Sequence, residues 1–125
     1  MVKTFISAIM VSIILSLAFI FEGLYVKNEF NALNNSFSSL YEKVQAEEAV
    51  ENDVLSVQEF WITKKKTLHA FIPHNEIKEI DLWLAETVYL VKEKEWVDSL
   101  SKIEVLIELT EQVPKIFTPA IENIL

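Results

Sequence analysis

The sequence predicts an all-α protein in which an N-terminal transmembrane helix continues into a four-helix bundle or two stacked helical hairpins. The 125 residues hold about one domain's worth of core, and 51% of them are hydrophobic. One Gly and three Pro are too few for the turns of a sandwich or barrel with many short strands. An uncharged apolar segment lies near the N-terminus, and amphipathic stretches with helical spacing follow it.

The apolar segment, residues 4–21, contains no charged side chain. As a helix it would reach about 27 Å, close to the hydrocarbon core of about 30 Å in a bilayer. We therefore expect residues 1–22 to form a membrane anchor and residues 23–125 to form a helical domain. The alternative is a cleaved signal peptide, since residues 16–18 resemble a cleavage site. The apolar run continues past that site, which favours the anchor.

The few charges near this segment predict its orientation. Lys3 and the α-amine precede it, whereas Glu22 follows directly and Lys27 and Glu29 come next. The positive-inside bias therefore favours a single-pass protein of the cell membrane with a cytoplasmic N-terminus and an extracytoplasmic domain.

Small residues recur every fourth position within the expected span, at Ala8, Ser12 and Ser16. Such a stripe lets two membrane helices approach closely, so the pattern allows a homo-oligomer that packs through the membrane helix. The alternative is that small residues fall there by chance and contact only membrane lipid.

The expected first hairpin follows without a break. Apolar residues at helical spacing continue from the span, and a second stripe runs up to Pro73. The first stripe comprises Phe30, Leu33, Phe37, Leu40, Tyr41 and Val44, and the second comprises Ala46, Val50, Val54, Val57, Trp61, Leu68 and Phe71.

The expected second hairpin begins at Asn75, a suitable N-cap, and turns at residues 92–95. Thr118 and Pro119 then predict the start of a short last helix. The third stripe comprises Ile77, Ile80, Leu84, Val88 and Val91, and the fourth comprises Trp96, Leu100, Ile103, Leu106, Ile107, Thr110 and Val113.

The stripes match in pairs. The first superposes on the third with an offset of 47 residues, and the second superposes on the fourth with an offset of 46. Two similar hairpins are too few for an extended solenoid, so we expect them to close on each other.

The chain resembles a small family of membrane-anchored proteins from endospore-forming Gram-positive bacteria, defined as a domain of unknown function. The residues that carry the resemblance are Trp61 with the lysines at 64–66, the junction at 71–77, and residues 122–125. The resemblance implies a short N-terminal span and an exported helical domain, with genes often beside those of larger integral membrane proteins. It implies no activity and no functional residues.

Charge and composition exclude several function classes. The net charge is −8 and Arg is absent, which argues against a nucleic-acid partner. Without Cys there is no thiolate nucleophile or Cys-based metal site. A single glycine, Gly23, excludes the glycine-rich loops that hold nucleotides. We therefore expect no cofactor.

No catalytic or metal-binding residue can be identified. His69 and His74 lie on opposite sides of a helix-breaking proline, so we expect them to be too scattered to bind a metal. The acidic cluster at 47–53 suits a solvated helix start. A hydrolase of cell-wall material would need two opposed carboxylates, and none of the 19 acidic residues forms an identifiable pair.

Lys64 lies on the apolar stripe of the second helix. Its ammonium group must either extend to the surface or meet a buried carboxylate. We expect the first outcome, because it is the commoner one.

The third helix carries a second apolar strip. Leu82 and Tyr89 lie far from its core line, on the face shared with Glu79 and Glu86, and Trp83 flanks them. Either this helix is buried on several sides, or Leu82, Trp83 and Tyr89 bind a partner. We predict a non-enzymatic domain that binds a protein partner in the membrane. The alternative is an extracytoplasmic small-molecule sensor bundle, which the absence of Arg disfavours.

Overall fold

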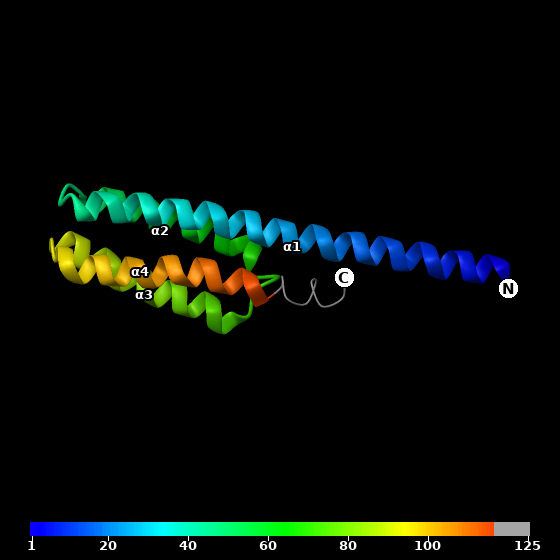
Figure 1. Cartoon of the computed structure of the whole chain (residues 1–125). Coiled ribbons are helices and arrows are strands. Elements are labelled where there is room, and N and C mark those ends of the chain that lie inside the picture. The colour runs from blue at the N-terminus through cyan, green and yellow to red at the C-terminus, as the bar shows by residue number, and fades with distance from the viewer. Residues whose placement is uncertain (117–125) are drawn as a thin grey trace.

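The computed structural model describes residues 1–116, and these form four α-helices and one short 3-10 helix (Figure 1). The predicted all-α fold is confirmed. The helix expected at Thr118 lies outside the described residues. The elements are α1 (Val2–Gln45), α2 (Glu51–Leu68), α3 (His74–Lys92), α4 (Trp96–Gln112) and η1 (Val113–Ile116).

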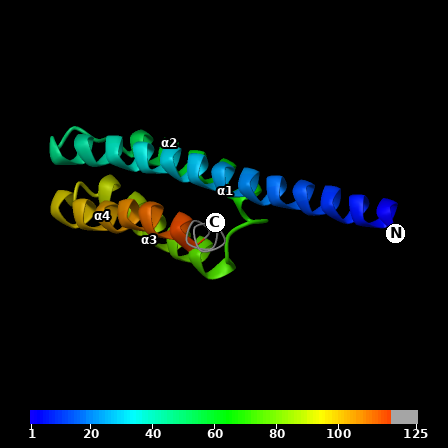
Figure 2. The same ribbon diagram turned by 45° about the vertical axis from the view of Figure 1, so that its right-hand side comes forward.

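The four helices form an up-down-up-down bundle. Each helix packs on the next in sequence, and α4 returns to pack on α1, which is the most extensive of these contacts. The turns at 46–50 and 93–95 lie at one end, which we call the distal end. The turn at 69–73 and η1 lie at the other, which we call the proximal end, and Figures 1 and 2 agree on this arrangement.

The first helix extends far beyond the bundle. At about 1.5 Å per residue its 44 residues span about 66 Å. Its buried side chains begin only at Val26, and the apolar segment before them projects past the proximal end (Figures 1 and 2), with none of that segment buried among the described residues. That segment is long and apolar enough to cross a membrane, and a signal sequence near an N-terminus would pass the same test.

The core follows the predicted stripes. Trp61, Phe30 and Phe37 are its largest fully buried side chains. Predicted stripe residues that are buried are Phe30, Leu33, Phe37, Leu40, Val44, Val54, Val57, Trp61, Leu68, Ile77, Ile80, Leu84, Val91, Ile103, Leu106, Thr110 and Val113.

Eight stripe positions are less buried than predicted. Five of them are half-buried and still pack against the core: Tyr41, Phe71, Trp96, Leu100 and Ile107. The other three differ for local reasons. Ala46 and Val50 are exposed because they belong to the turn before α2, and Ala49 fills the core there instead. Val88 is only half-buried, since the neighbouring Thr87 faces the core. Thr87 is accommodated because its hydroxyl donates to the Trp83 carbonyl at 2.8 Å, which satisfies the buried donor.

The predicted cap of α3 is wrong by two residues. The helix begins at His74, and Pro73 is its N-cap with φ −55° and ψ 140°. The Pro73 carbonyl accepts hydrogen bonds from the N–H groups of Glu76 and Ile77, at 3.1 and 3.4 Å. Proline has no N–H of its own to satisfy, so it can precede the first turn without an Asn75 side-chain cap.

The two hairpins turn in the same way. Glu47 and Lys94 stand 47 positions apart, and both have φ 58°, in the left-handed region. The N–H of Glu47 donates to the Val44 carbonyl at 2.9 Å. The N–H of Lys94 donates to the Val91 carbonyl at 3.0 Å. Both turns are thus left-handed helix C-caps, matching the repeat seen in the sequence.

Candidate functional site

The outer face of α3 exposes two large apolar side chains. Leu82 is 64% exposed and Tyr89 is 62% exposed. Trp83 is only half-buried and packs against the core, and the Lys102 ammonium lies 4.7 Å from the centroid of its ring. Of the three residues predicted to bind a partner, two are therefore on the surface and Trp83 is partly exposed, with Lys102 against its ring.

A shallow, mostly apolar depression lies beside these side chains, with a volume of ≈ 460 Å³. The Lys102 ammonium reaches from α4 to the Glu86 carboxylate on α3 at 3.3 Å and bounds the depression. We call this surface, with Leu82 and Tyr89, the α3 patch. Its residues are Leu82, Ala85, Glu86, Tyr89, Leu90 and Lys102.

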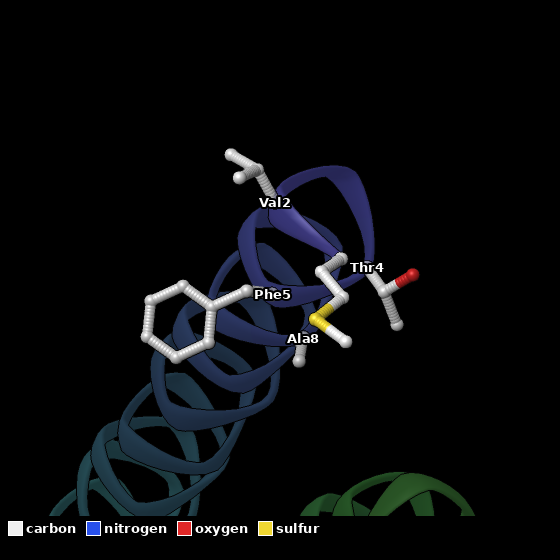
Figure 3. A pocket seen from close by; sticks show the side chains of 5 residues that line it. Val2, Thr4, Phe5 and Ala8 are labelled. Carbon is white, nitrogen blue, oxygen red and sulfur yellow. The ribbon is translucent and has the colours of Figure 1, made fainter.

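The residues predicted to pack membrane helices are all exposed on the lone part of α1. The Ser16 hydroxyl donates to the Ser12 carbonyl at 2.9 Å, so it is satisfied within its own helix. Ala8 helps to line a hollow at the N-terminal turns, where Val2 and Phe5 project outward from the helix (Figure 3). Side chains of one helix alone form this hollow, so the packing of Ala8, Ser12 and Ser16 stays a prediction.

The interpretation that Lys64 extends to water is wrong. Its ammonium lies 2.9 Å from the Glu29 carboxylate of α1, and the two side chains are 24% and 17% exposed. The ammonium also lies 5.2 Å from the centroid of the Phe60 ring. The expectation failed because α1 places a carboxylate opposite Lys64, and the sequence gives no sign of this pairing across helices.

A second polar cluster joins α2 to α3. The indole N–H of Trp61 donates to the Asp81 carboxylate at 2.6 Å, and the Lys65 ammonium lies 3.2 Å from both carboxylate oxygens. The largest buried side chain thus has its only polar atom satisfied. Sequence reasoning missed this cluster, because nothing in the local pattern links residues twenty positions apart.

Hydrogen bonds between side chains also connect α1 to α4. The Asn34 amide donates to the buried Thr110 hydroxyl at 2.9 Å. The Tyr41 hydroxyl donates to the Glu104 carboxylate at 3.0 Å, which raises the pKa of Tyr41 above its ordinary value. These bonds fix the antiparallel register of the two helices that contact each other most.

The two histidines lie together. The expectation that Pro73 scatters them is wrong, since the turn at 69–73 brings the rings of His69 and His74 to a centroid distance of 5.9 Å. Lys66 and His69 line one depression at the proximal end, of ≈ 430 Å³. Among residues 1–116, no group of three or more His, Cys, Asp or Glu side chains is placed to hold a metal ion.

Comparisons with known proteins give one match. No curated protein and no solved structure matches the chain. Residues 20–124 match a protein family, and this range begins near the end of the apolar segment and includes the whole bundle. The chain therefore belongs to the family described as Domain of unknown function (DUF4363).

Proposed function

We propose that this protein is a membrane-anchored helical domain that binds a protein partner through the α3 patch, without catalysis. The observation that carries the proposal is the exposure of Leu82 and Tyr89, at 64% and 62%, beside an apolar depression. Large exposed apolar groups that adjoin one another on a bundle surface are typical of interaction sites. The paired charges of Glu86 and Lys102 supply a polar rim.

The membrane anchor is supported by the lone apolar part of α1 and by the charges around it. Lys3 precedes the apolar segment and Glu22 follows it, so the positive-inside bias favours an extracytoplasmic bundle. Lipid would surround the segment, and a second copy would pack at Ala8, Ser12 and Ser16.

The partner we propose is an integral membrane protein. The part of α1 within the bundle, from Val26 to Val44, would be about 28 Å long. An anchored bundle keeps the α3 patch within about this distance of the bilayer surface. The patch therefore lies within reach of the exposed part of an integral membrane protein in the same bilayer. The alternative function, a small-molecule sensor bundle, stays a prediction.

Crosslinking tests the proposal, because the chain has no native Cys. A photoactivatable crosslinker is attached to Ala85→Cys, in the patch, or to Ile62→Cys, an exposed apolar position on α2. In native membranes, mass spectrometry should identify one membrane protein joined to position 85 and not to position 62. The double change Leu82→Ser and Tyr89→Ser should abolish this product while leaving the melting temperature nearly unchanged.

Two outcomes would contradict the proposal. One is a product that forms equally from both positions, or that persists in the double variant. The other is a large fall in melting temperature in the double variant, which would assign Leu82 and Tyr89 to the core.

A further inference from the structure

We propose that the proximal end of the bundle binds the phosphate headgroups of anionic phospholipids through Lys66, His69 and His74. This inference rests on the proposed membrane anchor and is independent of the protein partner. Three observations carry it: the distance between the apolar segment and the bundle, the distribution of charge along the bundle, and three basic side chains around one turn that have no ion-pair partner among residues 1–116.

The proximal end lies next to the apolar segment. The charge-free run ends at Phe21 and the buried face of α1 begins at Val26, within one unbroken helix. Five residues of helix span about 8 Å, which matches the headgroup layer of about 5–8 Å on each side of a bilayer. When the apolar segment spans a membrane, the proximal end therefore reaches the headgroups.

The turn between α2 and α3 is held beside the part of α1 that follows the apolar segment. The Tyr25 hydroxyl on α1 donates to the Thr67 hydroxyl on α2 at 2.9 Å. The ring of Tyr25 also contacts the ring of Phe71 edge to face, with centroids 5.8 Å apart. These contacts fix the turn beside the first residues that leave the apolar segment, so His69 and His74 lie there as well.

Charge differs strongly between the two ends. The proximal end, residues 22–27, 66–78 and 113–116, has four Lys and two Glu. The distal end, residues 42–53 and 92–98, has three Lys and eight Asp or Glu. A negatively charged surface attracts the first and repels the second. The charge pattern therefore orients the bundle with its proximal end on the membrane.

The basic side chains at this turn are available to a ligand. Lys66, His69 and His74 are exposed, and within residues 1–116 no carboxylate lies within ion-pair distance of any of them. Neighbouring Lys65, in contrast, is engaged by Asp81 at 3.2 Å. Ammonium and imidazole N–H groups are donors for phosphate oxygens, and Lys66 and His69 share the ≈ 430 Å³ depression. Because this depression lies beside the apolar segment, we expect the phosphate to belong to a phospholipid and not to a free anion.

Fluorescence quenching in vesicles tests the inference on the full chain. A fluorophore is placed on Ala70→Cys in the proximal turn or on Ala46→Cys in a distal turn, both exposed alanines of a chain without Cys. Vesicles of phosphatidylcholine carry lipid with a quencher on its headgroup, with or without about 30% phosphatidylglycerol. Position 70 should be quenched and position 46 should not. The anionic lipid should raise quenching at position 70.

Two matched variants identify the binding groups. Replacing Lys66, His69 and His74 with Gln should remove the gain from phosphatidylglycerol. Replacing Lys92 and Lys94 with Gln at the distal end should leave that gain in place. Inorganic phosphate at constant ionic strength should not compete.

Each contrary result has a separate meaning. Equal quenching at both positions, or no effect of phosphatidylglycerol on chains that float with the vesicles, would overturn the lipid site alone. If inorganic phosphate removes the increase in quenching that phosphatidylglycerol produces, the three side chains bind a free anion, and this result would also overturn the lipid site. Chains that do not float with vesicles would overturn both this site and the membrane anchor. The crosslinking of the α3 patch tests the protein partner separately.

Discussion

The indole nitrogen of Trp61 lies 2.6 Å from the Asp81 carboxylate, so a single hydrogen bond ties the largest core side chain to the neighbouring helix. Because Asp81 also accepts from Lys65, the carboxylate retains a partner when the indole is removed. The bond and the burial of the ring can therefore be separated by mutation.

Trp61→Phe should destabilise the protein by about 1–3 kcal/mol, since it removes the N–H and leaves most of the ring volume. Trp61→Ala should cost about 3–5 kcal/mol, because it also opens a cavity. Chemical denaturation measures both. Val97→Ala is the control, as Val97 is 81% exposed, and it should change stability by less than about 0.5 kcal/mol. Equal losses for Phe and Ala would show that the hydrogen bond carries the whole effect.

The ion pair between Lys64 and Glu29 predicts a non-additive pair of mutations. Either Lys64→Met or Glu29→Leu alone should destabilise by about 1–3 kcal/mol, because it leaves a largely buried charge unpaired. The double variant should recover most of this loss, since two apolar groups can pack in the same space. A double-mutant cycle measures the coupling, and additive losses would refute the pairing.

The contacts of Asp53 predict a pH-dependent contribution to the stability of the protein at the start of α2. The Val50 N–H donates to its carboxylate at 2.9 Å and the Lys43 ammonium lies 3.0 Å away, and these contacts lower the pKa of Asp53 below 3.8. The carboxylate therefore stabilises the fold above about pH 4, and this contribution disappears as the pH falls through the lowered pKa. Asp53→Ala should cost about 1 kcal/mol at pH 7, because solvent screens the charge. The difference from the natural protein should shrink as the pH falls through the lowered pKa of Asp53, as measured by thermal unfolding over a series of acidic pH values. A difference that does not shrink would assign the effect to packing.

The two left-handed turn residues predict stabilising substitutions. Glu47→Gly and Lys94→Gly should each stabilise by up to about 1 kcal/mol, since glycine has no Cβ to strain a positive φ. Greater freedom in the unfolded chain offsets part of that gain. Because the turns share their geometry, the two gains should be similar and additive in thermal unfolding. Destabilisation by either change would show that its side chain contributes more than the relieved strain.

The helices and most of the core follow from local pattern, which is why the sequence predicts them. Leu33 and Ile103 are buried because large apolar residues at helical spacing must face a neighbouring helix. Thr87 and Ser99 are equally buried, but they are small and polar, so apolar spacing does not reveal them. Their burial depends on which face of α3 or α4 meets the next helix.

The candidate sites were less predictable, since they depend on contacts between helices. The position of Leu82 around α3, far from the line of core residues, follows from helical spacing. The sequence left open whether this side of α3 is buried or exposed, and Leu82 is exposed. Trp83 lies near the edge of the core, where Lys102 from α4 covers its ring. The proximity of His69 and His74 depends on the path of a five-residue turn, which composition does not determine.

The unbroken α1 also makes the bundle a rigid lever. About 35 Å of helix separates Phe21 from the distal end of α1, and α1 has no non-helical residue between them at which it could hinge. If the apolar segment spans a bilayer, a tilt of about 20° would sweep the distal end sideways by about 12 Å. The contacts that set the tilt of the anchor in the membrane would then determine how far from the anchor axis the acidic turns of the bundle are carried.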